Sequence, residues 1–268
     1  MESLILTRYL FSLDDVRHSL FIEILDKNYE KALYWTYELY WSGYEDDTFT
    51  FLITNLYELM YDVNEEFHNR IKKEYEDWLE DNSKYENIGN IVVNLCFRNY
   101  KISKFVNAYF NIQCNDEVKE EFNTNLYINL QKSDVNDYLT EQGNYTLLKK
   151  VYKYELRTET NILFDSIIDK EKQREELLKN WEYYAYKCPY WKNKFDEHNA
   201  EITENKITFI NVEEEEKFYN SYNLEIDEQS KDIQNIAIGI NSKELDLKSF
   251  LEKYGGKIIT KKIKKNKK

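Results

Sequence analysis

Residues 28–43 read NYEKALYWTYELYWSG and carry more structural information than any other part of the chain. On a helix, which turns by about 100° per residue, they give two apolar faces. One face carries Leu33, Tyr34, Tyr37, Tyr40 and Trp41, and much of the other carries Ala32, Trp35 and Leu39. A narrow polar strip remains, made of Lys31, Glu38 and Ser42. A helix that is apolar on both sides must be packed on both sides, so we predict a helix from Asn28 to Gly43 inside a helical layer.

The rings of Tyr34, Trp35, Tyr40 and Trp41 have two interpretations. Aromatic residues at helical spacing usually fill a core, where each buried ring contributes roughly 1.5–3 kcal/mol. The buried tyrosine hydroxyls would then need partners, because an unpaired one costs about 1–3 kcal/mol. Alternatively, the four rings are exposed and form a protein-binding surface. Of the two, we expect core packing.

The same apolar spacing continues on both sides of residues 28–43. It predicts helices that begin at Ser12 and that cover residues 47–61, 64–79 and 83–100. Because only a few residues separate consecutive helices, neighbours should pack antiparallel as hairpins. We find no repeat period, which makes a solenoid the weaker version of this arrangement. The expected fold is mainly α, as an antiparallel helical bundle or an array of helical hairpins.

Composition divides the chain into four parts. Residues 1–110 are expected to form a helical domain, and residues 111–145, rich in Asn, Asp and Thr, an irregular connecting region. Residues 146–256 should form a second mainly helical region packed on the first, with helices over 147–156 and 170–186 and a last helix opened by Ser242. Its small β element is expected near 201–212, and residues 257–268 should be a disordered basic tail.

Charge is unevenly distributed along the chain. There are 50 acidic and 37 basic residues, so the formal net charge is −13. The last twelve residues hold seven lysines and no acid: Lys257, Lys261, Lys262, Lys264, Lys265, Lys267 and Lys268. Subtracting seven from −13 leaves −20 for residues 1–256. The body should repel phosphate backbones, while the tail is either a contact for nucleic acid or an acidic partner, or a solvated end.

The cysteines and the N-terminus point to a reducing compartment. Cys96, Cys114 and Cys188 are an odd number without a C-x-x-C pair, which favours buried thiols over disulfides or a zinc site. Residues 1–8 lack the basic flank and apolar run of a signal peptide. No segment approaches the roughly 20 apolar residues of a spanning helix. We expect a cytoplasmic protein that is not inserted in a membrane.

The sequence carries no strong catalytic motif. The six glycines never cluster as in a phosphate-binding loop, and no serine lies in a G-x-S-x-G turn. The histidines His18, His68 and His198 are far apart, and we expect surface or structural roles for all three. We therefore predict no catalytic residue, no cofactor and no metal ion.

Two weaker signals remain. Glu204-x-Lys206 and Glu225-x-Asp227-Glu228 carry carboxylates that could bind magnesium in a nuclease, but Glu-x-Lys also occurs at Glu117 and Glu215, as chance predicts. Cys188 in the sequence CPYW would be reactive only beside a base or a helix N-terminus. We interpret CPYW as a turn whose aromatic rings fix the chain to the core.

Three segments are informative together: residues 32–44, ALYWTYELYWSGY, residues 188–191, CPYW, and residues 224–229, LEIDEQ. They resemble an uncharacterised protein family of nucleocytoplasmic large DNA viruses, the giant viruses. The bias toward Asn, Lys, Ile and Tyr agrees with an AT-rich genome of that kind. The resemblance implies a viral origin and a location in infected-cell cytoplasm or the virion, and it implies no activity.

Three functions are open at this point. The first is a non-enzymatic helical protein that acts by binding another protein, as dense aromatic residues and an acidic surface suggest. The second is a nucleic-acid-associated factor that uses the lysine-rich tail. The third is a metal-dependent hydrolase, which would require Glu204, Glu225, Asp227 or Glu228 to meet in one pocket beside a lysine.

Overall fold

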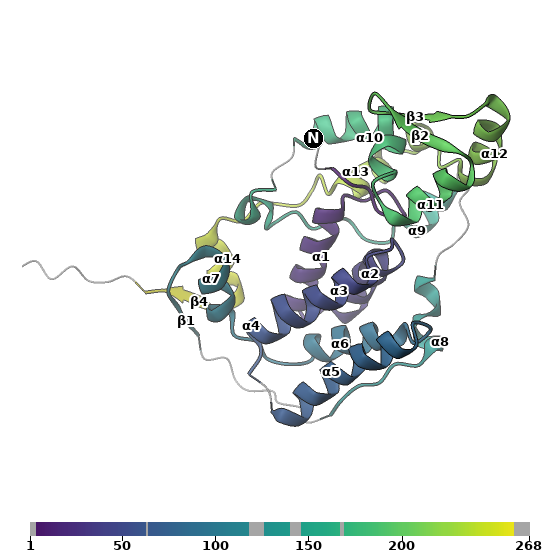
Figure 1. Cartoon of the computed structure of the whole chain (residues 1–268). Helices are drawn as coiled ribbons and strands as arrows, with labels where there is room; N and C mark the ends of the chain where they lie inside the picture. The colour runs from purple at the N-terminus through teal and green to yellow at the C-terminus, as the bar shows by residue number, and fades with distance from the viewer. Residues whose placement is uncertain (1–3, 63, 118–125, 140–145, 167–168, 260–268) are drawn as a thin grey trace, which may run out of the picture.

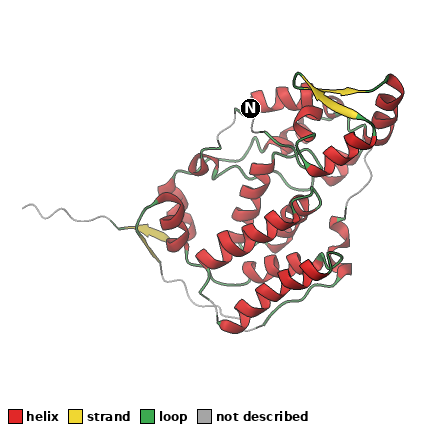
Figure 2. Ribbon diagram, in the orientation of Figure 1, coloured by secondary structure: helices red, strands yellow, loops and turns green. Residues whose placement is uncertain are grey.

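The computed structural model of the chain describes residues 4–62, 64–117, 126–139, 146–166 and 169–259. Within these ranges the protein is mainly helical, with two small antiparallel sheets (Figures 1 and 2). This confirms the predicted fold class and its small β content. Every helix in the described ranges is too short or too polar to cross a bilayer.

Four helices pack side by side in the first part of the chain. They are α1 (Leu13–Leu25), α2 (Tyr29–Tyr40), α6 (Glu86–Cys96) and α5 (Glu65–Glu80). Helix α2 packs on α1 and on α6, and α6 packs on α5. The helix that is apolar on two sides therefore lies between two neighbours, as its sequence predicts.

The aromatic side chains of α2 fill the core between these helices. Tyr34, Trp35 and Tyr40 are buried and Trp41 is half-buried, so the expectation of core packing is confirmed. The hydroxyl of Tyr34 donates to the Val151 carbonyl at 2.8 Å. The hydroxyls of Tyr37 and Tyr40 likewise donate to backbone carbonyls. These bonds offset the cost of burying the hydroxyls.

Two residues of the polar strip, Glu38 and Ser42, are also buried, which the helical pattern did not predict, while Lys31 stays partly exposed. Glu38 is fully buried, and its carboxylate accepts hydrogen bonds from Arg8 Nε at 2.9 Å and from the Thr7 hydroxyl at 2.5 Å. Ser42 is buried too, and its Oγ accepts from Arg8 N at 2.9 Å. The N-terminal segment covers this side of α2, so a carboxylate that faces water in an isolated helix becomes part of a buried ion pair.

The helix predicted over residues 47–61 is a continuous helical segment of three parts. It consists of α3 (Glu45–Thr50), the π-helix η1 (Phe51–Tyr57) and α4 (Glu58–Met60). The next helix, α7 (Ile102–Phe110), packs on α4 and was not predicted. Helix α6 ends at Cys96, earlier than the predicted end near residue 100.

The second half of the chain adds shorter elements. These are α8 (Lys132–Val135), η2 (Asn136–Tyr138), α9 (Leu147–Val151), η3 (Asn161–Phe164), α10 (Lys170–Ala185), α11 (Pro189–Glu197), α12 (Val212–Tyr222), η4 (Ile226–Glu228), α13 (Lys231–Ile238) and α14 (Leu247–Tyr254). The N-terminal segment joins the two halves, because Trp191 Nε1 donates to the Thr7 carbonyl at 3.1 Å and Leu6 N donates to the Tyr184 carbonyl at 3.2 Å.

The two sheets each contain one antiparallel strand pair. Strands β2 (Ala200–Thr203) and β3 (Lys206–Phe209) form an antiparallel hairpin where a small β element was predicted near 201–212. Strands β1 (Cys114–Asp116) and β4 (Gly256–Ile258) bring the connecting region and the end of the described chain together (Figure 1). Lys257 therefore lies in a strand opposite Asn115, whereas the sequence placed it in a disordered tail. The other six lysines of that tail lie outside the described residues.

Two predicted helix boundaries in this half are wrong, and so is the turn predicted at CPYW. Helix α9 ends at Val151 instead of near 156. The last helix, α14, is capped by Asp246, whose side chain accepts a hydrogen bond from Ser249 N at 2.7 Å. Ser242, the predicted cap, lies before this helix, and its hydroxyl accepts a hydrogen bond from Thr158 N at 2.8 Å. CPYW is the start of α11, with Pro189 in its first turn, where its missing N–H costs nothing.

Candidate functional site

A pocket of about 460 Å³ opens between α1, α3, η1, α7 and η3. Its walls are apolar and largely aromatic: Phe21, Phe51, Leu56, Phe105, Tyr109 and Phe164. Its polar lining is Asp14, Arg17, His18, Asp47, Thr50, Asn55 and Ser166. We call it the His18 pocket. Apolar atoms make up most of the surface of this pocket, whereas polar atoms make up most of the surface of the other pockets of 470–540 Å³.

His18 is linked to a buried carboxylate through an asparagine. Its Nδ1 lies 2.6 Å from Asn161 Oδ1, and Asn161 Nδ2 donates to Asp15 Oδ1 at 2.6 Å. The second oxygen of Asp15 lies 3.3 Å from Lys170 Nζ. Asp15 and Asn161 are almost fully buried, with 1% and 2% of their surfaces exposed. The middle of the relay is thus shielded from water, whereas His18 at one end and Lys170 at the other are partly exposed.

This relay determines which nitrogen of His18 carries the proton. A carboxylate only accepts hydrogen bonds, so the amide nitrogen of Asn161 must face Asp15 and its oxygen must face His18. Nδ1 of His18 must therefore carry a proton and donate it. Burial lowers the pKa of His18, and the bond to Asn161 and the charge of Asp15 only partly oppose this. The neutral imidazole then leaves Nε2 as a hydrogen-bond acceptor.

The rings around His18 hold it in place. The imidazole stacks on Phe164 with 5.1 Å between ring centroids and 27° between the planes. Phe164 also contacts Phe105, and Phe105 stacks on Phe21 at 4.9 Å and on Tyr109 at 4.5 Å. Rings from α1, α7 and η3 therefore form one packed wall.

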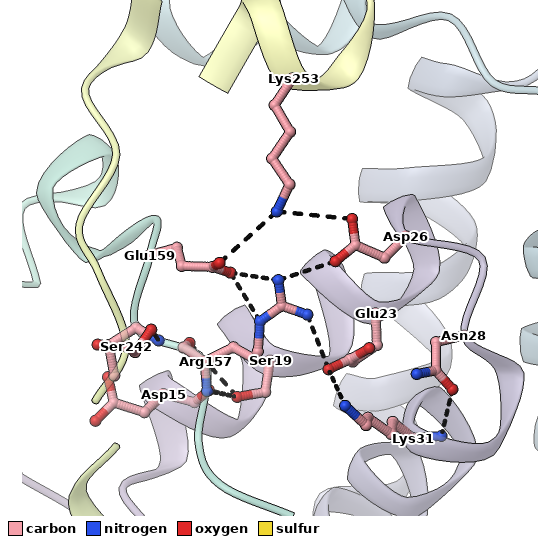
Figure 3. A network of polar contacts seen from close by, with 11 residues as sticks. Asp15, Ser19, Glu23, Asp26, Asn28, Lys31, Arg157, Glu159, Ser242 and Lys253 are labelled. Atoms are coloured by element: carbon pink, nitrogen blue, oxygen red, sulfur yellow. Dashed lines mark hydrogen bonds and ion pairs between the residues drawn. The ribbon is translucent and has the colours of Figure 1, made fainter. Parts of the chain in front are cut away.

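Figure 3 shows how the segment that carries Asn161 is fixed to α1. The guanidinium of Arg157 lies between three carboxylates: Nη1 is 2.9 Å from Glu23 Oε1, and Nη2 is 2.9 Å from Asp26 Oδ2 and 2.6 Å from Glu159 Oε2. The Glu23 side chain is only 2% exposed. Because Glu23 lies in α1 and Asp26 directly follows its last residue, these contacts hold residues 157–161 along that helix and place η3 beside the pocket.

The π-helix η1 supplies another wall. Phe51, Asn55 and Leu56 of its seven residues line the pocket. A π-helix has a wider turn than an α-helix and is frequent at functional sites. Its position here is a second sign that this region does more than pack the core.

The residues named from sequence as partner contacts lie elsewhere. Tyr34, Trp35, Tyr40 and Trp41 are taken up by the core and do not form an open surface. Of the seven lysines, Lys257 is exposed on β4, and Lys261, Lys262, Lys264, Lys265, Lys267 and Lys268 lie outside the described residues.

The acids and the cysteine considered for catalysis form no site in the described ranges. In these ranges, no group of three His, Cys, Asp or Glu side chains is placed to hold a metal ion. Glu204, Glu225, Asp227 and Glu228 therefore do not form the metal site that a hydrolase would require. The Cys188 thiol is buried and donates to the Ser42 carbonyl at 3.1 Å. Burial raises the pKa of Cys188 to about 12, so the thiolate needed for reaction is not formed at neutral pH.

Two histidines have structural partners, and the third is the residue that sequence reasoning missed. His68 bonds to the Tyr57 hydroxyl at 3.0 Å, and His198 lies 3.5 Å from Glu214. His18 and Asp15 are three residues apart, which places them on one helix face and is a weak signal of a shared site. The sequence offers no signal for Asn161, which is more than 140 residues away.

Comparisons with known proteins found no relative of this chain. No protein-family model, no curated protein sequence and no solved structure matches this chain. Function is therefore inferred from the residues and their geometry.

Proposed function

We propose that the chain is a binding protein that holds a small organic molecule in the His18 pocket. The observation that supports this is the combination of aromatic walls with one oriented acceptor, Nε2 of His18. Small-molecule pockets commonly join a mostly apolar lining to a few placed polar groups. The volume of about 460 Å³ also falls within the usual range of roughly 300–1,000 Å³ for such sites.

Binding is favoured over covalent catalysis because His18 activates no nucleophile. In the described ranges, His18 is hydrogen-bonded to no hydroxyl or thiol. The hydroxyl of Ser166, which lines the pocket, donates to the Asn161 carbonyl at 3.3 Å. A nucleophile needs a base within hydrogen-bond reach, so this geometry supports ligand recognition.

The proposal is tested by closing the pocket mouth. Ligand-observed NMR with small one-ring and two-ring compounds should find binders to the full chain. Thr50→Trp, which puts an indole at the mouth, should weaken them by about tenfold or more, equal to about 1.4 kcal/mol. Thr54→Trp is the matched control, because Thr54 is exposed on the same helical segment and does not line the pocket. The absence of any binder, or equal effects of both variants, contradicts the proposal.

Protein binding is a second proposal, which rests on a different surface from the one the sequence named. Ile210, which follows β3, and Val212, the first residue of α12, are 70% and 67% exposed. Exposed apolar side chains favour association when they are contiguous. Co-purification from expressing cells should recover a stoichiometric protein that the double variant Ile210→Ser, Val212→Ser no longer holds. A partner retained by that variant excludes this surface.

We also propose a viral origin for this protein, a location in infected-cell cytoplasm or the virion, and binding of nucleic acid through its lysine-rich tail. The resemblance of residues 32–44 supports a viral protein of infected-cell cytoplasm or the virion. The lysines of residues 261–268 support contact with nucleic acid through phosphate charge.

A further inference from the structure

The rim of the His18 pocket carries an excess of negative charge. Asp14 and Asp47 supply two carboxylates against the single guanidinium of Arg17. Arg17 Nη1 lies 3.4 Å from Asp14 Oδ1, so these two charges form a pair. In the described part of the chain Asp47 has no ion-pair partner, and it is exposed at the rim. A cation at the mouth would therefore meet an unpaired carboxylate.

His18 lines the pocket and offers a ligand a hydrogen-bond acceptor, but no donor. Nδ1 is bonded to Asn161, and Nε2 of the neutral ring has a lone pair that no residue in the described part of the chain occupies. A ligand that brings an N–H group satisfies this atom. A carboxylate ligand would face Nε2 without a proton between them, and it would find Arg17 already paired with Asp14.

The walls suit a positive charge as well as an apolar body. Phe21, Phe105, Tyr109 and Phe164 form a contiguous aromatic cluster, in which Phe21 and Phe105 are buried while Tyr109 and Phe164 keep part of their surface exposed. The faces of aromatic rings attract ammonium groups within about 6 Å, while the ring edges and the space between them favour apolar carbon.

From these three features we propose that the ligand is an amine in its ammonium form on an aromatic or branched aliphatic body. The inference rests on the proposed binding function and names the chemistry of its ligand. The ammonium donates to His18 Nε2, its charge faces Asp47, and its body packs on the rings. A neutral alcohol would donate a hydrogen bond to Nε2 but would not interact with the charge of Asp47. An anion would donate no hydrogen bond to Nε2 and would be repelled by Asp47.

The test uses three compounds that share one ring and a short chain: 2-phenylethylamine, 2-phenylethanol and 3-phenylpropanoate. Their affinities for the full chain are measured by NMR titration at pH 7.5 and low salt. We expect the amine to bind about tenfold more tightly than the alcohol and the carboxylate to bind most weakly. Asp47→Asn should lower the affinity for the amine by about fivefold and leave that for the alcohol unchanged.

Asp46→Asn is the control for Asp47→Asn. Asp46 has the same charge on the same helix but accepts a hydrogen bond from the Tyr75 hydroxyl and does not line the pocket. The amine affinity should be the same in this variant as in the wild type. An equal loss in both variants would mean that only the general charge of α3 matters, and it would overturn the role given to Asp47.

Acidification gives an independent readout. The charged and titratable groups around His18 are Asp14, Asp15 and Arg17 on α1, Asp47 on α3, Tyr109 on α7 and, through Asp15, Lys170 on α10. Protonation of His18 removes the acceptor and adds a like charge, so amine affinity should fall as the pH drops through the pKa of His18, which burial holds below its ordinary value, while the carboxylate gains. The imidazole ¹⁵N shifts report the protonation of His18 in the same titration, and an amine affinity that does not change as the ring protonates overturns the contact with Nε2.

The outcomes separate this inference from the proposed function. If the alcohol or the carboxylate binds as tightly as the amine, the pocket binds small molecules but the ligand class is wrong. If none of the three compounds binds and the wider compound set also fails, both proposals are overturned. Preference for the amine that depends on Asp47 and on neutral His18 supports both.

Discussion

Arg157→Met removes the cation that ties residues 157–161 to α1, and we expect it to lower the free energy of unfolding by about 3 kcal/mol. Loss of one partner of a buried ion pair typically costs about 3–5 kcal/mol, because the other charge is left buried. Glu23 is the buried partner, with 2% of its side chain exposed. Asp26 and Glu159 are 28% and 18% exposed and can be solvated, which places the estimate at the low end.

The destabilisation should depend on pH in a definite direction. Burial raises the pKa of Glu23, while Arg157 and Lys31 oppose this rise. Without Arg157 the pKa of Glu23 rises further above its value in the unfolded chain. Between those two pKa values the folded state binds more protons than the unfolded state, so stability falls as pH rises. The variant should therefore be more destabilised at pH 8 than at pH 5.

Urea unfolding followed by circular dichroism measures both effects. Adding Glu23→Gln to Arg157→Met removes the buried charge and should restore most of the lost stability. Arg174→Met is the control, because the Arg174–Glu171 pair is on the surface of α10, and it should cost less than about 1 kcal/mol. The reasoning is refuted if Arg157→Met costs no more than this control, or if its cost is the same at both pH values.

Three further predictions concern the relay, a close backbone contact and the tail. Asn161→Leu should convert His18 from one tautomer, protonated at Nδ1, to a mixture, as read from imidazole ¹⁵N shifts; an unchanged spectrum would contradict the relay. Gly43→Ala should cost about 2 kcal/mol or more in urea unfolding, because its backbone has φ of +91° and a Cβ would lie 2.6 Å from Pro189 Cβ; a loss below about 0.5 kcal/mol would refute this. Truncation after Ile259 keeps β4 but removes six lysines, so it should abolish salt-sensitive DNA and RNA binding; binding that survives truncation excludes the tail.

Local sequence was sufficient for most of the first helical layer. The two apolar faces of residues 28–43 predict a helix packed on both sides, and α2 lies between α1 and α6. Asn64 predicts the start of α5, since its side chain accepts from Phe67 N at 2.9 Å. The cap of α5 depends on a contact between residues three apart in the chain. The packing of α2 depends on which faces of the helix are apolar, and the spacing of apolar residues shows this directly. Both features can therefore be predicted from local sequence.

Features that depend on distant residues were not predictable. Glu38 belongs to a polar strip in the helical pattern, yet Arg8 and Thr7 bury it in the folded chain. Helical spacing also cannot distinguish the π-helix η1 from an α-helix, because the apolar residues satisfy both.

The candidate site belongs wholly to this second category. In the sequence, His18 is a single histidine among charged neighbours on a predicted helix. No residue near it in the chain indicates a ligand. The pocket exists because Arg157 holds η3 against α1, which brings Asn161 to His18 and Phe164 beneath its ring. Contacts between residues more than 130 positions apart leave no periodic pattern in the sequence. The helices could therefore be predicted from the sequence, whereas the oriented imidazole and its aromatic walls form only when those helices pack.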